Sequence, residues 1–472
     1  MRRTKIVCTI GPASDGLLEE LIAAGMDVAR LNFSHGTMEE QGQRIRRLRQ
    51  AAEAVQRPLA ILLDIQGPKI RIGKMEPDSV LEPGQRFSLI CGDPSLVGDS
   101  TKAAVSYPHL YRFVRPGHTI YLDDGLIEIQ VEEVQGETIH CRVVIGGLLT
   151  SRKGLVLPDV DVDLPALTEQ DKEHIRFGVE MGVDMIAASF VRRAEHVRAV
   201  REVIREAGGD QPVIAKIESR QGVEHLEEII QESDGIMVAR GDLGVHIPPE
   251  EVPLVQKQII QLCNRYGKPV ITATQMLESM VSNPRPTRAE VTDVATAILD
   301  GTDAIMLSGE TAVGKYPVQA VRVMDRIAQR TERAIDYVEL LNRRSTSPEP
   351  TISEAISHAT VRAAADLKAA AILTATQSGF TARMVSKFRP PTPIIALTPV
   401  PEVARRLMVV WGVEPIVVPM TRQVDEMLDV AFDVVRRRPD IKPGDRIVIT
   451  AGVRTGEPGS TNLLQVYEVG KV

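Results

Sequence analysis

Two pairs of charged residues end two neighbouring apolar runs in the middle of the chain. Lys216 and Glu218 end the first run, and Arg240 and Asp242 end the second. Because side chains alternate along a strand, each pair is expected to share one face. Such charges at the ends of buried strands are costly unless they are paired or coordinated. Carboxylate oxygens suit a hard divalent cation, and Lys216 would face the anion that the cation carries. Two buried ion pairs are the structural alternative.

The same strand–helix unit repeats along the chain. Between the two runs, apolar residues in 223–230 recur at helical spacing, which predicts strand, helix, strand. Apolar runs predict eight strands, at 5–10, 27–32, 59–64, 184–189, 212–218, 235–242, 269–274 and 304–308. Amphipathic stretches predict helices at 17–24, 39–54, 169–181, 195–207, 252–266, 288–299 and 318–337.

Polar residues also stand at the carboxyl ends of most other predicted strands. They are Arg30, Asn32, Asp64, Ser189, Thr274, Ser308 and Glu310. An open, doubly wound sheet is one candidate fold, but it gathers its ligands at a single switch point. A (β/α)8 TIM barrel brings all eight strand ends together, where its active sites are built. The sequence therefore predicts an α/β fold with a TIM barrel formed by 1–67 and 165–341.

A long interruption follows the third predicted strand. Between 68 and 164 the pattern changes to alternation with turn residues, which predicts strands at 119–122, 126–134 and 137–145. Gln135-Gly136 predicts a hairpin turn between the last two. We interpret 68–164 as an all-β domain inserted in a βα loop, where it would act as a lid over the barrel mouth. A decorative insertion is the alternative.

A polar, proline-containing linker at 342–350 precedes a further set of strands and helices. Strands are predicted at 370–374, 393–397, 415–418 and 446–451, with helices between them. This pattern predicts a C-terminal α/β domain over 351–472.

The composition limits the classes of partner. The chain has 472 residues and a net charge of −7, with 43% hydrophobic and 25% charged residues, typical of a soluble globular protein. An acidic balance argues against nucleic-acid binding, no apolar run is long enough for a membrane span, and the N-terminus lacks the features of a signal peptide. Cys8, Cys91, Cys141 and Cys263 form no CxxC pair. We expect a cytoplasmic protein, with neither nucleic acid nor membrane as a partner.

One stretch of the chain matches a phosphate-binding motif only in part. The stretch 309–316 nearly matches a P-loop, but Tyr316 stands where the magnesium-binding hydroxyl is required. The predicted barrel mouth is instead rich in Arg, Lys, carboxylate and hydroxyl groups. That mixture suits an anionic, phosphorylated substrate held by a metal, because phosphoryl transfer and enolate formation both depend on positioned cations.

Six blocks of the chain resemble those of the pyruvate kinases, and the resemblance extends over essentially the whole length. The blocks are 4–14, 29–36, 214–218, 237–244, 273–280 and 306–311. The resemblance implies a glycolytic kinase that transfers the phosphoryl group of phosphoenolpyruvate to ADP and protonates the enolate, giving pyruvate and ATP. It also implies dependence on Mg²⁺ or Mn²⁺, allosteric control and a homotetramer.

The resemblance assigns roles at the barrel mouth. Glu218 and Asp242 would bind the divalent cation, and Lys216 and Arg30 would contact the transferring phosphoryl group. The backbone at Gly241 and Asp242 would hold the substrate carboxylate.

A second set of implied roles concerns the proton and the nucleotide. The hydroxyl of Thr274 would also bind the carboxylate and, with Ser308 and Glu310 behind it, form the side from which the proton is delivered. The residues that would contact the ADP phosphates under the lid are Asn32, His35, Arg71 and Asp123.

Two departures from the family pattern bear on ions and nucleotide. Members that require a monovalent cation bind it at positions that match Asn32, Ser34, Asp64 and the carbonyl of Ile65, and they usually carry Glu where this chain has Lys69. A lysine ammonium is a compact, tethered cation, so we expect that K⁺ is not required. A solvated hinge lysine is the alternative. Gln170 replaces a frequent Lys, so ADP contacts there would be weaker or supplied from elsewhere.

The C-terminal domain carries a hydroxyl-rich loop at the start of a predicted helix, where backbone N–H groups readily bind phosphate. In relatives the matching loop binds a phosphorylated activator, with help from a later loop like 452–461. We expect a sugar phosphate or AMP here, and a plain N-capped helix is the alternative. The candidate residues are Thr374, Thr376, Ser378, Gly379 and Thr381.

Two other functions fit a barrel with a lysine on a strand. Lys216 could form a Schiff base in an aldolase-like enzyme, although Glu218 and Asp242 nearby would keep it protonated. A catalytically silent metabolite-binding protein is the other possibility, and the intact set of charged residues argues against it.

Overall fold

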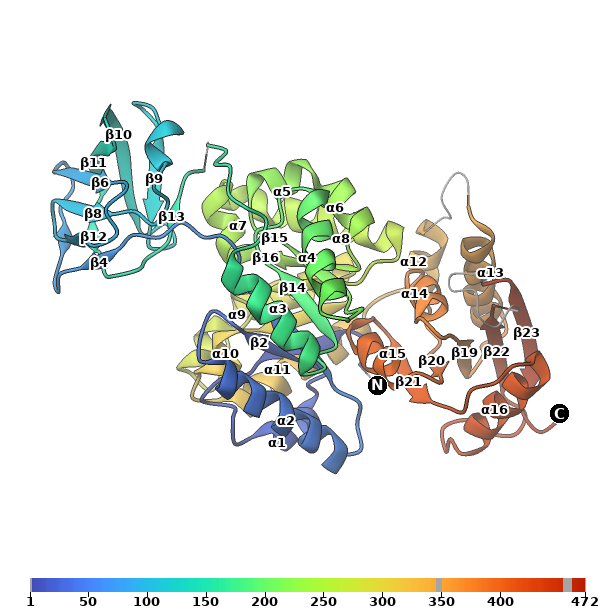
Figure 1. Ribbon diagram of the computed structural model, residues 1–472. Coiled ribbons are helices and arrows are strands. Elements are labelled where there is room, and N and C mark those ends of the chain that lie inside the picture. The colour runs from blue at the N-terminus through green and yellow to red at the C-terminus, as the bar shows by residue number, and fades with distance from the viewer. Residues whose placement is uncertain (1, 159, 345–349, 453–460, 472) are drawn as a thin grey trace.

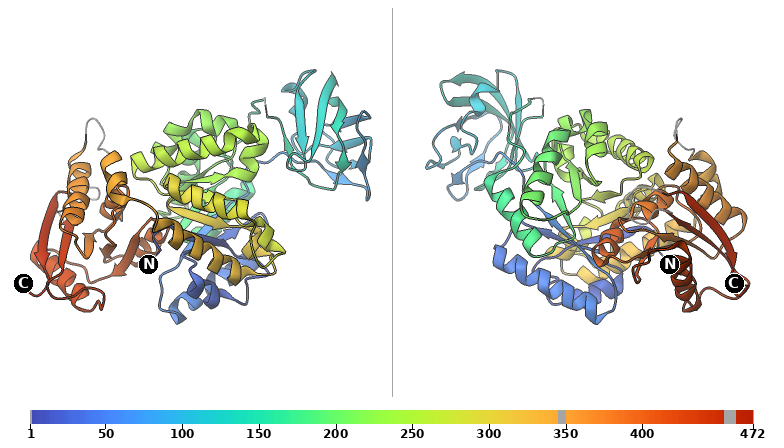
Figure 2. Two further views of the ribbon diagram at one scale, coloured as in Figure 1. Left: turned by 180° about the vertical axis from the view of Figure 1, so that it is seen from behind. Right: turned by 45° about the vertical axis from the view of Figure 1, so that its right-hand side comes forward.

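The computed structural model describes residues 2–158, 160–344, 350–452 and 461–471, which form three units (Figure 1). A central barrel carries a β-rich inserted unit, predicted to act as a lid and called the lid below, on one side and an α/β domain on the other. Figure 2 shows the same order from behind, with the N-terminal segment between the barrel and the C-terminal domain. The lid and the C-terminal domain therefore lie at opposite ends of the barrel.

The central unit is the predicted closed barrel of eight parallel strands, in the order β1-β18-β17-β16-β15-β14-β3-β2. The strands are β1 (Lys5–Thr9), β2 (Val28–Asn32), β3 (Ala60–Asp64), β14 (Met185–Ala188), β15 (Val213–Ile217), β16 (Gly235–Ala239), β17 (Val270–Ala273) and β18 (Ala304–Leu307). Nearly every strand residue is buried, because helices cover the outside and side chains fill the interior. The predicted TIM barrel is confirmed.

The helices of this unit surround the sheet. They are α1 (Leu18–Ala24), α2 (Met38–Ala54), α3 (Glu169–Glu180), α4 (Ala194–Glu206), α5 (Arg220–Glu224), α6 (Leu226–Glu232), α7 (Arg240–His246), α8 (Val252–Tyr266), α9 (Arg288–Asp300), α10 (Gly309–Ala312) and α11 (Pro317–Glu332). The next helix, α12 (Tyr337–Arg343), lies beside the C-terminal unit (Figure 1). Thr37, Thr168 and Thr287 open α2, α3 and α9 with capping boxes, in which the threonine and the acidic residue three positions later bond each other's backbone N–H groups.

Two predicted elements end earlier than expected. The strand predicted over 235–242 ends at Ala239, and Arg240 begins α7. Arg240 and Asp242 therefore do not share a strand face, and that prediction is wrong. The helix predicted over 318–337 ends at Glu332, because the side chain of Asp336 accepts two N–H groups and so starts α12 as a new helix.

The inserted unit is all β, as predicted. Its strands are β4 (Lys74–Met75), β5 (Val80–Leu81), β6 (Arg86–Ile90), β7 (Val97–Gly98), β8 (Lys102–Ala104), β9 (Thr119–Leu122), β10 (Ile127–Gln135), β11 (Thr138–Ile145), β12 (Gly147–Leu148) and β13 (Leu155–Val156). The main sheet has the order β13-β9-β10-β11-β6-β8. Gln135 pairs with Thr138 across the predicted hairpin turn.

The C-terminal unit is a five-stranded sheet with helices. Its elements are α13 (Ile352–Asp366), β19 (Ala371–Ala375), α14 (Phe380–Ser386), β20 (Ile394–Thr398), α15 (Pro401–Arg406), β21 (Val413–Val417), α16 (Val424–Arg436), β22 (Arg446–Ala451) and β23 (Leu463–Glu468). The sheet order is β21-β20-β19-β22-β23, and β23, which was not predicted, pairs antiparallel with β22. Within the described residues, no helix has the length and apolar character that a membrane crossing requires.

Aspartates tie the amino-terminal ends of the barrel strands together. Asp27, Asp184 and Asp303 each precede a strand, and each carboxylate accepts the N–H of a residue in an adjacent strand, at 2.9, 2.7 and 3.1 Å. Arg405 and Arg389, from the C-terminal domain, pair with Asp184 at 2.7 Å and with Asp303 at 2.9 Å. We call these three aspartates and their arginine partners the base cluster.

Candidate active site at the barrel mouth

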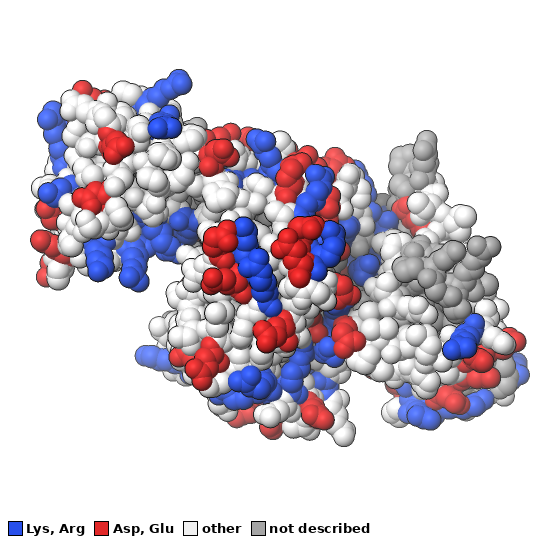
Figure 3. Space-filling view, in the orientation of Figure 1, with Lys and Arg blue, Asp and Glu red and all other residues white. Residues whose placement is uncertain are grey.

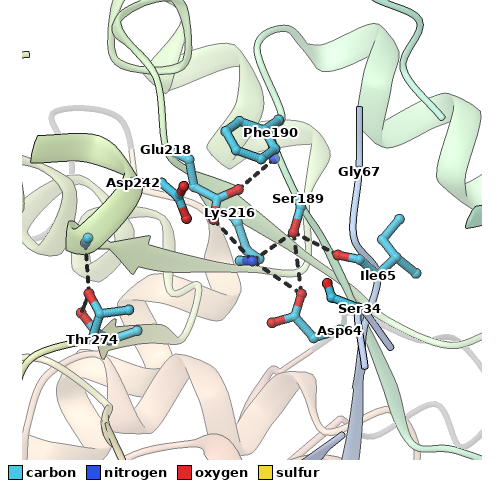
Figure 4. A network of polar contacts seen from close by, with 12 residues as sticks. Ser34, Asp64, Ile65, Gly67, Ser189, Phe190, Lys216, Glu218, Asp242 and Thr274 are labelled. Atoms are coloured by element: carbon cyan, nitrogen blue, oxygen red, sulfur yellow. Dashed lines mark hydrogen bonds and ion pairs between the residues drawn. The ribbon is translucent and has the colours of Figure 1, made fainter. Parts of the chain in front are cut away.

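Lys216 lies at the centre of the polar network at the carboxyl ends of the strands (Figure 4). It is the fourth residue of β15, and its ammonium donates to Ser189 Oγ at 2.7 Å. The ammonium also lies 3.0 Å from Glu218 Oε1 and 3.2 Å from Asp64 Oδ1. Lys216 and Glu218 thus lie on the same side of the strand, as the alternation predicts. Burial lowers the pKa of Lys216, but Asp64 and Glu218 more than offset it and leave the pKa raised.

Arg30, at the end of β2, joins this network through Asp64. Its Nε lies 2.7 Å from Asp64 Oδ2, and its Nη1 donates to Thr9 Oγ1 at 3.0 Å. Burial raises the pKa of Asp64, but Lys216 and Arg30 outweigh it and lower the pKa below its usual range. Asp64 is therefore a charged anchor that orients two cations toward the barrel mouth.

Glu218, which directly follows β15, and Asp242 of α7 lie beside each other (Figure 4). The N–H of Phe190 donates to Glu218 Oε2 at 2.7 Å, and Lys69 Nζ lies 2.7 Å from Asp242 Oδ1. Burial raises the pKa of Glu218 and the charge of Asp242 adds to it, so Lys216 only partly offsets the cost. In Asp242, by contrast, burial raises the pKa but Lys69 and Lys216 bring it below the usual value.

The two carboxylates suit a divalent metal ion. Their oxygens are hard donors, and the raised pKa of Glu218, which burial causes in the first place, indicates that its protein neighbours do not fully stabilise the ionised carboxylate. Across the described residues, no three His, Cys, Asp or Glu side chains form a metal site by themselves.

Thr274 lies on a strained turn that follows β17. It has φ 66°, and the next residue, Gln275, has φ 55°. Each such left-handed non-glycine residue costs about 1–3 kcal/mol, so the surrounding contacts must hold the turn. The N–H of Gly241 donates to Thr274 Oγ1 at 2.8 Å, and Oγ1 donates to the carbonyl of Ala273 at 2.7 Å. This pair of bonds fixes the hydroxyl at the mouth.

Ser308 and Glu310 follow β18. Glu310 is fully buried, and its carboxylate accepts the N–H groups of Ser308 at 2.7 Å and Leu277 at 3.0 Å. Burial raises the pKa of Glu310 above its usual range. The hydroxyl of Ser308 is buried without a hydrogen-bond partner among the described residues. These two side chains can hold and pass a proton.

The predicted nucleotide contacts are spread over the barrel rim and the lid. Asn32 Oδ1 accepts the N–H of Ser34 at 3.2 Å, and His35 is exposed. Arg71 donates to the carbonyl of Arg152 at 3.0 Å. Figure 3 shows Lys and Arg side chains gathered on the side of the lid that faces the barrel.

Two further positions belong to this group. Asp123 lies 2.7 Å from Lys153 Nζ, so its charge is paired within the lid. Gln170 is exposed on the first turn of α3.

Lys69 does not lie against the residues predicted to hold a monovalent cation. Its ammonium contacts Asp242 and is 3.6 Å from Asp124 of the lid. Asp64 is paired with Arg30 and Lys216 instead, and the carbonyl of Ile65 accepts a hydrogen bond from Ser189 Oγ at 2.7 Å. The structure therefore places the lysine charge beside the candidate metal ligands.

The candidate effector loop leads into α14. Thr374 is fully buried, and its hydroxyl has no partner among the described residues, whereas Ser378 is exposed. Gly379 adopts φ 78° at the start of the helix. The hydroxyl of Thr381 bonds that of Thr461 at 2.9 Å. Thr376 is buried. The second predicted loop, 452–461, falls largely on 453–460, outside the described residues.

Three residues in the site had been given no role from the sequence, although Ser189 and Arg240 were expected at strand ends. Ser189 bridges Lys216 and Ile65, and its position at a strand end was the available signal. Phe190 adopts φ 53° and directs its N–H to Glu218, and no sequence pattern marks that conformation. Arg240 was recognised as a buried charge, but its contacts with the Thr274 turn were not foreseen.

Comparisons with known proteins agree with this geometry. The models of the pyruvate kinase barrel domain and of the pyruvate kinase alpha/beta domain match residues 1–321 and 354–467. A pyruvate kinase of Clostridium acetobutylicum is 48% identical over 473 residues, 99% of this chain and 100% of that protein. The Geobacillus stearothermophilus enzyme is 51% identical over 99% of this chain and 80% of its own length. The pyruvate kinase of Staphylococcus aureus (strain MRSA252) is 49% identical over 100% of this chain and 81% of its own length. The chain therefore belongs to the pyruvate kinase family of phosphotransferases.

Proposed function

We propose that the chain transfers the phosphoryl group of phosphoenolpyruvate to ADP, giving pyruvate and ATP, as a glycolytic enzyme of the cytoplasm. The observation that carries the proposal is the network around Lys216, which sets two buried cations and two adjacent carboxylates at the barrel mouth. Such a site suits a substrate with both a phosphate and a carboxylate, because each needs positioned positive charge.

Lys216 and Arg30 face the transferring phosphoryl group in this proposal. At about 4 Å and an effective dielectric constant near 20, one such charge is worth roughly 4 kcal/mol before desolvation. Glu218 and Asp242 would hold Mg²⁺ or Mn²⁺, which supplies positive charge to the phosphate and to the enolate oxygen. The backbone at Gly241 and Asp242 and the hydroxyl of Thr274 would bind the substrate carboxylate, for which the Gly241 N–H has to leave Thr274 Oγ1.

The proton for the enolate arrives from the side of Thr274. A threonine hydroxyl is a weak acid by itself, so Ser308 and Glu310 would supply the proton through ordered water. The raised pKa of Glu310 supports this assignment, because the buried carboxyl holds a proton at a higher pH than an exposed one. Asn32, His35 and Arg71 would contact the ADP phosphates, with Asp123 and Gln170 at the margin.

We further propose that the enzyme does not require K⁺. The ammonium of Lys69, 2.7 Å from Asp242, supplies a fixed positive charge next to the substrates. Asp64, the one charged residue of the matching monovalent-cation positions, is already paired with Arg30 and Lys216.

The larger organisation is proposed on the same basis. The catalytic barrel comprises 1–67 and 165–341, the lid 68–164, and the C-terminal effector and assembly domain 351–472. A sugar phosphate or AMP activates the enzyme at Thr374, Thr376, Ser378, Gly379 and Thr381, and the active form is a homotetramer. Loss of activation in a Ser378→Ala/Thr381→Ala variant, with the basal rate kept, would support the effector site; unchanged activation would remove it.

The direct test measures ATP formation from phosphoenolpyruvate and ADP with Mg²⁺, in buffers with and without K⁺. Equal rates are expected in both. Activity only with K⁺ would leave the phosphoryl transfer standing and remove the role of Lys69. An inactive protein that is trapped by borohydride with pyruvate would instead favour a Schiff base at Lys216.

A further inference from the structure

Arg240 holds the turn that carries Thr274. It is the first residue of α7, and its side chain is only 10% exposed. A guanidinium has five N–H groups, and here each has an acceptor. Nε donates to Ala273 O at 3.1 Å, Nη2 to Thr274 O at 2.6 Å and Met276 Sδ at 2.9 Å, and Nη1 to Gln256 Oε1 at 3.3 Å and Asp293 Oδ1 at 2.7 Å.

These contacts connect the strained turn to the outer helices. Three of the acceptors belong to Ala273, which ends β17, and to Thr274 and Met276 of the turn, where Thr274 and Gln275 have positive φ values. The other two, Gln256 and Asp293, lie on α8 and α9. A turn in such a conformation persists only when its surroundings determine it, and Arg240 supplies much of that constraint.

One of the bonds affects the Thr274 hydroxyl directly. The hydroxyl donates its proton to Ala273 O, and Arg240 Nε donates to the same carbonyl oxygen. To donate to a substrate or a water, the hydroxyl must leave that carbonyl. A buried carbonyl without a partner is costly, but the bond from Arg240 remains when the hydroxyl turns away.

We propose that Arg240 is a positioning residue, whose guanidinium fixes the Thr274 turn and keeps the Ala273 carbonyl bonded while the Thr274 hydroxyl turns toward the substrate. The proposal deepens the proposed function and rests on the role given there to Thr274. Shape matters more than charge in this role, because a lysine ammonium presents its donors from a single point and cannot span these acceptors.

The proton step should suffer most when the guanidinium is lost. Entry of solvent deuterium into the methyl group of pyruvate, with Mg²⁺ and ATP present, reports that step. In Arg240→Lys the exchange rate is expected to fall roughly 100-fold, the scale of a catalytic group displaced by about 1 Å. ATP formation falls less, because the enolate can leave and take a proton from water, and the KM for phosphoenolpyruvate stays nearly unchanged.

Chemical rescue separates this role from a merely structural one. Arg240→Ala leaves space for a free guanidinium ion, so guanidinium chloride at millimolar concentration is expected to restore exchange, whereas methylammonium chloride does not. Arg201→Ala is the matched control, since Arg201 also bonds a backbone carbonyl and an aspartate, but on α4. Its exchange rate should stay at the wild-type value and should not respond to guanidinium.

Two results would overturn the proposal. One is wild-type exchange in Arg240→Lys. The other is an equal loss of exchange and of ATP formation in Arg240→Ala, without rescue, which would make Arg240 a structural residue only. If Arg240→Ala does not fold, Arg240→Lys and Asp293→Asn allow the same comparison of exchange with ATP formation. In Asp293→Asn the loss of exchange relative to ATP formation is expected to be smaller. A wild-type protein that forms no ATP would refute the proposed function itself, and the inference with it.

Discussion

Both ends of the barrel bury charged side chains, but the two ends balance them differently. In the base cluster, burial raises the pKa of Asp27, yet Arg2, Lys5 and Arg57 more than offset it and leave the pKa lowered. At the mouth, burial raises the pKa of Glu218, Asp242 adds to the rise, and the pKa stays above its usual range. At the base the protein's own cations stabilise the charge of Asp27, whereas at the mouth the charge of Glu218 is stabilised incompletely and a bound cation would add to it.

The difference explains how one fold uses the same residue types for stability and for chemistry. Asp184 and Asp303 bond backbone N–H groups and arginines of the C-terminal domain, so they hold two domains together. Glu218 pairs with Lys216 and Asp242 pairs with Lys69, and the two carboxylates lie beside each other. Substitutions at the base should therefore reduce stability, and substitutions at the mouth should reduce activity, in keeping with the division found in barrel enzymes.

The largest effect on activity is expected at Lys216. In Lys216→Met, kcat falls about 10³-fold, because a buried cation aimed at the phosphoryl group is lost. The coupled assay of ATP formation measures this, and Lys172→Met, at a partly exposed lysine of α3, is the control that keeps the wild-type rate. A Lys216→Met enzyme within tenfold of wild type would break the distinction between mouth and base.

The largest effect on stability is expected at the base. The side chain of Arg389 is only 3% exposed, and Asp303→Asn removes its carboxylate partner. The free energy of unfolding should therefore fall by about 3 kcal/mol. Calorimetric unfolding measures the loss, while kcat of the folded enzyme should change little. Asp366→Asn, at an exposed pair with Arg362, should shift stability by less than about 1 kcal/mol. Similar melting of the two variants would contradict the role of the base cluster.

A smaller change is expected when the charge beside Asp242 is reversed. Lys69→Glu should lower activity in K⁺-free buffer roughly tenfold, because part of the local positive charge is lost, and added K⁺ should restore it. Lys74→Glu, at an exposed lysine of the lid, should show neither effect. Rates of Lys69→Glu that do not respond to K⁺ would remove the lysine from the account of ion dependence.

The smallest effect concerns pH and His196 of α4. Burial, with a further contribution from Arg192, lowers the pKa of His196 to about 4 from 6.5. The unfolded chain therefore binds a proton that the folded protein does not, and stability is lost as the pH falls from about 6.5 to about 4. Because the ring is only partly buried, we expect this loss in the free energy of unfolding to be roughly 1 kcal/mol.

Melting temperatures at pH 7 and pH 4.5 measure this contribution. His196→Gln should lose less stability on acidification than the wild type, and His225→Gln, at a partly exposed histidine, serves as the control. An identical drop in melting temperature between pH 7 and pH 4.5 in His196→Gln and the wild type would show that this ring contributes nothing to the pH dependence.

The barrel could be predicted from the sequence because its strands are short apolar runs between turn residues. β15 and its two charges follow the simple alternation, so Lys216 and Glu218 were placed together correctly. β16 departs from the pattern at Arg240, where α7 starts directly after the strand. A run that contains Gly and charged residues does not reveal whether it continues as strand or turns into a helix.

Contacts between distant segments could not be predicted. Lys69 and Asp242 are 173 positions apart, and their pairing depends on how the lid linker leaves the barrel. The base cluster did have a sequence signal, since Asp27, Asp184 and Asp303 each stand immediately before a buried strand. Arg405 and Arg389, which pair with Asp184 and Asp303, come from another domain, and no local pattern identifies them.

The most direct test of the contrast between mouth and base is binding of Mn²⁺, measured by electron paramagnetic resonance without substrate. We expect that the wild type binds Mn²⁺, that Glu218→Gln loses most of that affinity, and that Asp303→Asn retains it. Undiminished binding by Glu218→Gln, or equal loss in Asp303→Asn, would contradict the claim that the uncompensated charge lies at the mouth.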